Sequence, residues 1–188
     1  MNYEMKSTSQ IRVCSVDEEG RFGGPERRIT QIAKALKGLG VDVHVVYPTH
    51  DSGKFSRELS EAGVSSSAFS ITRLSREKKV LAKYVISFFF EVIHLYRFFR
   101  REKFDLVQVN GSQQFKGALA ASMVGIPVIW VLEDTLMASA VKRLCTLIAR
   151  FTAAGIIVVG KRVHDYYIRG TSLESKPCVE IHPPVDTT

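Results

Sequence analysis

Cysteine is scarce in this sequence of 188 residues, and its few positions exclude two kinds of site. Cys14, Cys145 and Cys178 lie far apart, are odd in number, and form no CxxC motif or Cys/His cluster. A disulfide framework and a zinc site are therefore not expected, and the composition suits a reducing compartment.

Long apolar runs are also missing. The opening segment MNYEMKSTSQ contains no apolar stretch of the kind that a secretory signal peptide requires. Charged residues interrupt every apolar window before it reaches the roughly 20 residues of a membrane span. We therefore expect a cytoplasmic protein, with residues 1–10 as a disordered tail.

Acidic residues are fewer than basic ones, and the formal net charge is +7. This excess fits an ordinary basic soluble protein, or one that binds a nucleotide diphosphate, a nucleic acid or an acidic membrane. Nucleic acid is the weakest of these readings, because no RNP-like spacing or helix-turn-helix pattern occurs. We expect no nucleic-acid partner.

Short β-branched segments alternate with longer helical patterns along the chain. This alternation predicts βαβ units and a doubly wound, mainly parallel, Rossmann-like α/β sheet over residues 11–188. Strands are expected at 11–16, 41–48, 68–74, 105–110, 127–134, 155–160 and 178–186, and helices near 25–38, 58–62, 76–103, 115–124, 138–154 and 162–168. The strand residues expected in the core are Val13, Val45, Val107, Ile129 and Val158.

The loop after the first strand, DEEGRFGGPE, contains the first candidate binding site. In open α/β sheets the ligand binds outside the carboxyl ends of the strands. Gly23 and Gly24 lack a Cβ, so a phosphate can approach the backbone, and the following helix offers free N–H groups. The spacing fits neither the dinucleotide fingerprint nor the P-loop. The alternative is an ordinary turn.

The order of these motifs resembles the N-terminal domain of family-4-type glycosyltransferases, one half of a GT-B fold. GGPERR is similar to the family's GG-x-E-R, and DLVQVN, GIPVIWVLED, AAGIIVVGKRVHDYY and VEIHPPVDTT resemble its later strands and interdomain hinge. The resemblance implies transfer from a nucleotide-sugar to an acceptor glycan or lipid-linked sugar, with retention of configuration and without a metal or other cofactor. It implies that the C-terminal nucleotide-sugar domain is absent, so the isolated chain is expected to be inactive.

The resemblance also implies roles for individual residues. Gly23 and Gly24 would contact the donor phosphates. Glu133 occupies the position of a family histidine and is followed by Asp134. These two are the candidate catalytic residues, which would orient the acceptor hydroxyl; alternatively, they bind only helix N-termini or water.

Other positions depart from the family or repeat its patterns elsewhere. Gly160 replaces the usual serine, and together with Asn110 and Lys161 it is a candidate for the acceptor pocket. Glu18 and Glu26 are spaced like the paired glutamates of the family's second domain. Because they flank the glycine loop of the other domain, we interpret that spacing as a coincidence.

The segment 76–103 is basic at both ends and aromatic in the middle. Its candidate membrane-surface cations are Lys78, Lys79, Lys83, Arg97, Arg100 and Arg101. A helix of this kind either lies on an anionic membrane, here the inner face of the plasma membrane, or packs on the sheet. We expect Phe88, Phe89 and Phe90 to pack in the core, with the basic ends left for a membrane.

A second class of function stays open at this point. A stand-alone, non-catalytic Rossmann-like module that binds a nucleotide or regulates another protein fits the altered residue at Glu133 and the absent second domain.

Overall fold

The computed structural model describes residues 10–75 and 77–182. The predicted disordered tail, residues 1–10, and the predicted interdomain hinge, residues 179–188, lie for the most part outside the described residues, because residues 1–9 and 183–188 are not among them. Within the described residues, all seven strands run parallel in one sheet, in the order β3-β2-β1-β4-β5-β6-β7. The predicted doubly wound α/β fold is confirmed.

The strands follow the predicted segments closely, with one displacement. They are β1 (Ile11–Val16), β2 (Val41–Pro48), β3 (Ser65–Phe69), β4 (Leu106–Asn110), β5 (Val128–Leu132), β6 (Ala153–Val158) and β7 (Cys178–Glu180). The strand predicted at 68–74 is wrong in its position. The chain leaves the sheet after Phe69 because the N–H and hydroxyl of Thr72 donate to Glu91, a helix residue, and not to a strand.

Six helices connect these strands: α1 (Gly24–Lys37), α2 (Gly53–Glu61), α3 (Lys78–Glu102), α4 (Phe115–Val124), α5 (Ser139–Thr152) and α6 (Lys161–Tyr167). Pro25 lies in the first turn of α1, where its missing N–H removes no hydrogen bond. Gly125 ends α4 with a positive φ of 85°, which favours glycine over other residues.

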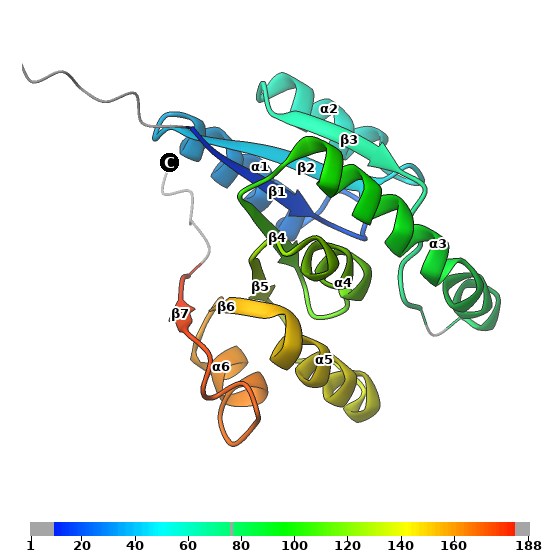
Figure 1. Ribbon diagram of the computed structural model, residues 1–188, viewed down its shortest axis with the longest axis vertical. Helices are drawn as coiled ribbons and strands as arrows, with labels where there is room; N and C mark the ends of the chain where they lie inside the picture. The colour runs from blue at the N-terminus through cyan, green and yellow to red at the C-terminus, as the bar shows by residue number, and fades with distance from the viewer. Residues whose placement is uncertain (1–9, 76, 183–188) are drawn as a thin grey trace, which may run out of the picture.

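The helices form two layers around the sheet (Figure 1). Helices α3, α4 and α5 lie side by side on one face, and α1 and α2 cover the other face over β1, β2 and β3. Alternate residues of β1 point into the two layers: Cys14 and Val16 pack with α3 and α4, whereas Val13 packs with α1.

The predicted strand core is confirmed at four of its five positions. Val13, Val45, Val107 and Val158 are buried. Ile129 is only half-buried, so its prediction is wrong. It lies beyond the part of the sheet that α1 and α2 cover, whereas its neighbours on β5, Val128 and Trp130, point into the opposite core and are fully buried.

The strand order reverses between β1 and β4, because the chain moves from β1 toward β3 and then returns to the other side of β1. The loops at the carboxyl ends of these two strands diverge to opposite faces of the sheet. Such a switch point is where open α/β folds bind their ligands.

Candidate functional site

A cavity of about 320 Å³ opens at this switch point. Its walls come from the segments that follow three adjacent strands: residues 17–19 after β1, 110–114 after β4 and 133–134 after β5. Pro25 and Glu26 of α1 and the residues Arg73, Leu74 and Met137 complete it. The volume lies within the usual range for small-molecule sites.

The lining of this cavity is acidic, although the whole chain is basic. Its ionisable residues are Asp17, Glu18, Glu19, Glu26, Glu133, Asp134 and Arg73. Six carboxylates therefore face one arginine, and Arg73 is already paired with Glu19 at 2.8 Å. A lining of this kind favours a ligand that donates hydrogen bonds and disfavours a phosphate. We name it the acidic cavity.

Two carboxylates at the base of the acidic cavity are almost completely buried. Burial raises the pKa of Asp17 well above its usual value, and the nearby carboxylates of Glu26 and Glu133 add to the rise. Burial likewise raises the pKa of Glu18 to about 7, against the opposing effect of Lys116. A pKa of about 7 leaves Glu18 close to the boundary between its charged and neutral forms at neutral pH, so its carboxyl group could accept or donate a hydrogen bond.

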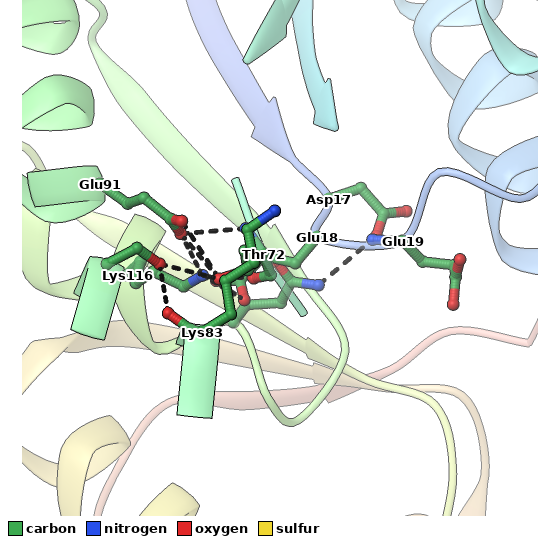
Figure 2. Close-up of polar contacts among 9 residues, drawn as sticks. Asp17, Glu18, Glu19, Thr72, Lys83, Glu91 and Lys116 are labelled. Atoms are coloured by element: carbon green, nitrogen blue, oxygen red, sulfur yellow. Dashed lines mark hydrogen bonds and ion pairs between the residues drawn. The ribbon is translucent and has the colours of Figure 1, made fainter. Parts of the chain in front are cut away.

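Lys116 is the cation that holds this region together (Figure 2). The side chain projects from α4 and is fully buried, with its Nζ 2.6 Å from Glu91 of α3 and 3.4 Å from Glu18. It also donates a hydrogen bond to the carbonyl oxygen of Thr72 and lies 4.3 Å from the ring centre of Tyr84. The loop after β1, the loop before α3, and helices α3 and α4 thus meet at one ammonium group.

The two halves of this ionic cluster differ in their hydrogen bonds. Burial would raise the pKa of Glu91, but donors from Lys116, Ser87 and the Thr72 N–H outweigh it and lower that pKa. The carboxylate of Glu18 has fewer partners: Oε2 lies 3.4 Å from Lys116 Nζ, and neither oxygen has a hydrogen bond of good geometry within the described residues. Glu18 is therefore the less fully satisfied carboxylate of the two.

The two candidate catalytic residues both line the acidic cavity. Glu133 forms an ion pair with Arg28 of α1, yet burial keeps the pKa of Glu133 above its usual value. Asp134 accepts a hydrogen bond from the N–H of Leu136 at 3.0 Å. Both carboxylates thus have protein partners, and both also border the space where a ligand would lie.

Asn110 also lines the acidic cavity, as predicted, but its side chain is engaged with the protein. Its amide donates to Ser15 Oγ at 2.8 Å and to the carbonyl oxygen of Val16 at 3.0 Å, joining the ends of β1 and β4. Two neighbours that the sequence did not indicate carry polar atoms without a partner. Ser112 Oγ and Gln114 Oε1 are buried, line the cavity, and have no hydrogen-bond partner in residues 10–75 and 77–182.

A second cavity, of about 400 Å³, lies beside the first at the N-terminus of α1. Its lining includes Gly24, Arg27 and Arg28, and it shares Pro25 and Glu133 with the acidic cavity. Arg27 is exposed, whereas Arg28 is buried against Glu133. We name it the arginine cavity, because both of its cations are arginines.

The glycines of the loop after β1 differ in how strictly the fold requires a residue without a Cβ. A Cβ at Gly24 would have open space around it, so nothing in the fold itself demands glycine there. A Cβ at Gly20 would overlap the carbonyl oxygen of His50, so that glycine allows the loops after β1 and β2 to touch. Gly23 donates its N–H to Glu26 at 2.6 Å, which fixes the first turn of α1.

The remaining two pocket candidates lie elsewhere. Gly160 precedes α6 and Lys161 is exposed at its start, and neither borders the acidic or the arginine cavity. The nearest neighbour of a Cβ placed on Gly160 would be His182, 3.9 Å away. The structure therefore does not bring these two residues together with Asn110.

The aromatic helix differs from its prediction. Phe88 is half-buried, but Phe89 is 73% and Phe90 77% exposed, so the expectation that all three pack in the core is wrong. The large apolar residues exposed on this layer of the fold are Leu81, Val85, Ile86, Phe89, Phe90 and Ile93 of α3, Met123 of α4, and Leu144, Leu147 and Phe151 of α5. We name this set the α3–α5 apolar surface.

The predicted cations border this surface. Lys78, Lys79, Lys83, Arg97, Arg100 and Arg101 are all exposed on α3. The sequence missed the exposed phenylalanines because a helical period shows which residues share a face but not which face meets the sheet. Of the helices that the structure describes, none is both long and apolar enough to cross a membrane.

A comparison with protein-family models identifies the family of the chain. The model described as Glycosyltransferase Family 4 matches residues 22–188. No curated protein matches the chain.

Three solved structures have the same fold. MurG of Acinetobacter baumannii is 17% identical, with a TM-score of 0.63, over 92% of this chain and 44% of its own. The lipopolysaccharide outer core galactosyltransferase WaaB is 12% identical, with a TM-score of 0.68, over 95% of this chain and 47% of its own. S. aureus MnaA, solved with UDP, is 14% identical, with a TM-score of 0.66, over 90% of this chain and 44% of its own. The chain thus spans less than half the length of these structures.

Proposed function

Since the chain belongs to glycosyltransferase family 4, we propose that it forms the acceptor-side half of an enzyme that transfers a sugar from a nucleotide-sugar with retention of configuration. The acceptor would be a glycan or a lipid-linked sugar. A second, nucleotide-sugar-binding domain would complete the site, in keeping with the share of MurG and WaaB that the chain covers. No cofactor is required by this proposal.

One observation supports the proposal above the others: two adjacent cavities carry opposite charge and share a wall. The arginine cavity and the acidic cavity meet at Pro25 and Glu133. A glycosyl transfer needs two adjacent binding sites of different charge, because the donor is an anionic diphosphate and the acceptor presents a hydroxyl group. The boundary between the cavities is therefore where we place the transferred sugar.

The donor phosphates would bind on the arginine cavity. Gly24 exposes the backbone at the start of α1, whose N-terminus favours an anion, and Arg27 adds an exposed positive charge. The N–H of Gly23 donates to Glu26, so Gly23 would offer a phosphate only the space left by its missing Cβ. The contact with phosphate is thus proposed for Gly24 and Arg27.

The acceptor sugar would bind in the acidic cavity. Its hydroxyl groups would donate hydrogen bonds to Asp17 and Glu18, and Ser112 and Gln114 would supply further polar contacts. Glu133 lies at the shared wall, where it would orient the reacting hydroxyl, and Arg28 keeps that carboxylate in place. Asp134, which follows Glu133 and also lines the cavity, would contact the acceptor as well.

We further propose that the enzyme binds the surface of an anionic membrane through α3. Exposed Phe89 and Phe90 would enter the interface while the cations at both ends of the helix meet lipid phosphates. Each such cation contributes about 1 kcal/mol, so binding would be reversible and sensitive to salt. The inner face of the plasma membrane is the surface that fits a cytoplasmic enzyme with a lipid-linked acceptor.

The test is an assay of the gene product that carries this chain, against a panel of nucleotide-sugars with and without acceptor glycans. We expect acceptor-dependent release of nucleotide from one of them. The 188-residue chain alone should release none and should bind any nucleotide-sugar with a Kd of about 1 mM at best. Micromolar binding by the chain alone, without turnover by the gene product, would instead support a stand-alone binding module.

A further inference from the structure

The acidic cavity carries more negative charge than the described cations beside it offset. Three of its six carboxylates form ion pairs with described residues: Glu18, Glu19 and Glu133. The other three form none within residues 10–75 and 77–182: Asp17, Glu26 and Asp134. A ligand that enters the cavity therefore meets carboxylates that still lack a positive partner in the described part of the chain.

Asp17 lies at the base of the acidic cavity and is only 3% exposed. The largest Coulombic effects on its pKa come from the carboxylates of Glu26, Glu133 and Glu19, and all three raise it. Both hydrogen bonds that described residues donate to Asp17 reach Oδ1, from the N–H of Glu19 at 2.9 Å and from Nε2 of Gln114 at 3.4 Å. A carboxylate surrounded by like charges favours a cationic ligand over a neutral one.

Two polar atoms in the same lining lack a partner. Gln114 Oε1 and Ser112 Oγ belong to residues that are 6% and 2% exposed, and neither atom has a hydrogen-bond partner among the described residues. Because the Gln114 amide donates to Asp17 through Nε2, its oxygen lies close to that carboxylate. An amide oxygen only accepts hydrogen bonds, so this position requires a donor. An ammonium group supplies three N–H donors and a positive charge, whereas a hydroxyl group supplies one donor and no charge.

We infer that the sugar bound in the acidic cavity carries a protonated amine, whose N–H groups bind Asp17 and Gln114 Oε1. This inference rests on the proposed function, because it specifies the chemical class of the acceptor. A sugar with hydroxyl groups alone would leave the buried carboxylate of Asp17 without a counter-charge, which is costly away from water. Glu26 and Asp134 would add to the attraction, because they line the same cavity and have no ion pair with a described residue.

The experiment measures binding of four sugars to the 188-residue chain by NMR chemical-shift titration in slightly acidic buffer. Glucose is compared with its 2-amino, 3-amino and 6-amino derivatives, each of which replaces one hydroxyl group by an ammonium group and leaves the ring unchanged. We expect at least one amino sugar to bind at least tenfold more tightly than glucose, about 1.4 kcal/mol, and 0.5 M salt to reduce this advantage by screening. If no amino sugar binds more tightly than glucose, the inference is overturned.

Three variants show whether the carboxylates of the cavity recognise the amine. Asp17→Asn keeps an oxygen that accepts hydrogen bonds but removes the charge, so it should reduce the advantage of the amino sugar at least threefold and leave glucose unchanged. Asp134→Asn, at a half-buried position, should also reduce that advantage and gives a second test if Asp17→Asn does not fold. Glu61→Gln removes an exposed carboxylate outside the cavity and, as the matched control, should change neither affinity.

Other outcomes decide against an amino sugar. If Asp17→Asn weakens glucose and the amino sugar by the same factor, the carboxylate maintains the shape of the cavity and does not recognise the amine. If methylammonium displaces the amino sugar at the same concentration, the cavity binds any small cation. The proposed function fails separately: in that case the amino sugar binds as expected, but the gene product consumes no nucleotide-sugar.

Discussion

Replacement of Lys116 is the substitution from which we expect a large loss of folding stability. Replacement by methionine keeps a side chain of similar length but removes the ammonium that lies 2.6 Å from Glu91 and 3.4 Å from Glu18. Both carboxylates are buried, so neither can be hydrated in its place. Breaking a buried pair by removing one partner costs about 3–5 kcal/mol, because an uncompensated charge is left behind.

The magnitude can be expressed as a melting temperature. For a domain of this size, 1 kcal/mol corresponds to about 2–4 °C, so Tm should fall by roughly 6–20 °C in Lys116→Met. Urea unfolding gives the free energy directly, and the single tryptophan, Trp130, is a convenient probe because it is fully buried. A loss of this size is a substantial part of the stability of an ordinary domain, which is about 5–15 kcal/mol in total.

A double variant shows whether the loss comes from the charge. Lys116→Met with Glu91→Gln removes both members of the closest pair, and we expect it to be more stable than Lys116→Met alone. Glu61→Gln, an exposed carboxylate at the end of α2, is the control and should change the unfolding free energy by less than about 0.5 kcal/mol. A loss below 1 kcal/mol in Lys116→Met would refute the reasoning, because the ammonium would then not be the charge that compensates this cluster.

Three further predictions concern pH, turnover and the membrane. Burial raises the pKa of Glu18 from 4.5 to about 7, so the folded chain holds this proton more tightly than the unfolded chain does, and the free energy of unfolding should fall as pH rises from 4.5 to 7. Glu18→Gln should reduce this fall, measured by urea unfolding at several pH values, and an unchanged pH profile would contradict the prediction. Gly24→Val should leave the circular dichroism spectrum unchanged, because a Cβ at this position has open space around it. The same substitution should lower kcat/KM of the gene product at least tenfold, about 1.4 kcal/mol, and an unchanged kcat/KM would show that the loop is an ordinary turn. Phe89→Ser combined with Phe90→Ser should reduce co-sedimentation with anionic liposomes, and 0.5 M salt should reduce it further by screening the charges. Leu39→Ser, which changes an exposed leucine beyond the end of α1, is the control and should not reduce it. Equal sedimentation of the unchanged chain, the double variant and the control would assign α3 to another role.

Much of the fold could be predicted because its signals are local. The β-branched segments, Pro25 in the first turn of α1 and the glycine after α4 each act within a few residues of themselves. The same local logic failed at β3, whose first three residues are serines, Ser65–Ser67. An edge strand with one neighbour needs little burial, so it carries a weak pattern.

The site was predictable only in its position. The order of strands and loops predicted a site at the carboxyl ends of the strands, and the resemblance to the family indicated Asn110 and Glu133, which line the cavity there. The link from Lys116 to Glu18 joins residues almost a hundred positions apart, and no local pattern reports such a contact. A signal was nevertheless present: Lys116 is the single charge in α4, and Glu91 is the single acid in the apolar middle of α3. A lone charge in an apolar helix needs a buried partner.

Glu18 was not singled out by the sequence for a different reason. Its spacing from Glu26 matched a family motif that belongs to another domain, and setting that match aside also set aside the residue. The structure shows that Glu18 is buried beside Lys116, a property that spacing does not encode.

The most direct test of the account is whether the two cavities bind two different substrates. Arg27 is exposed in the arginine cavity, and Asp17 is buried in the acidic cavity, so each can be changed without touching the other. With the gene product in steady state, Arg27→Ala should raise the KM for the nucleotide-sugar at least threefold and leave the acceptor KM unchanged, whereas Asp17→Asn should do the reverse. If both substitutions change the KM of the same substrate, or if neither changes either KM, the assignment of donor and acceptor to these cavities is wrong.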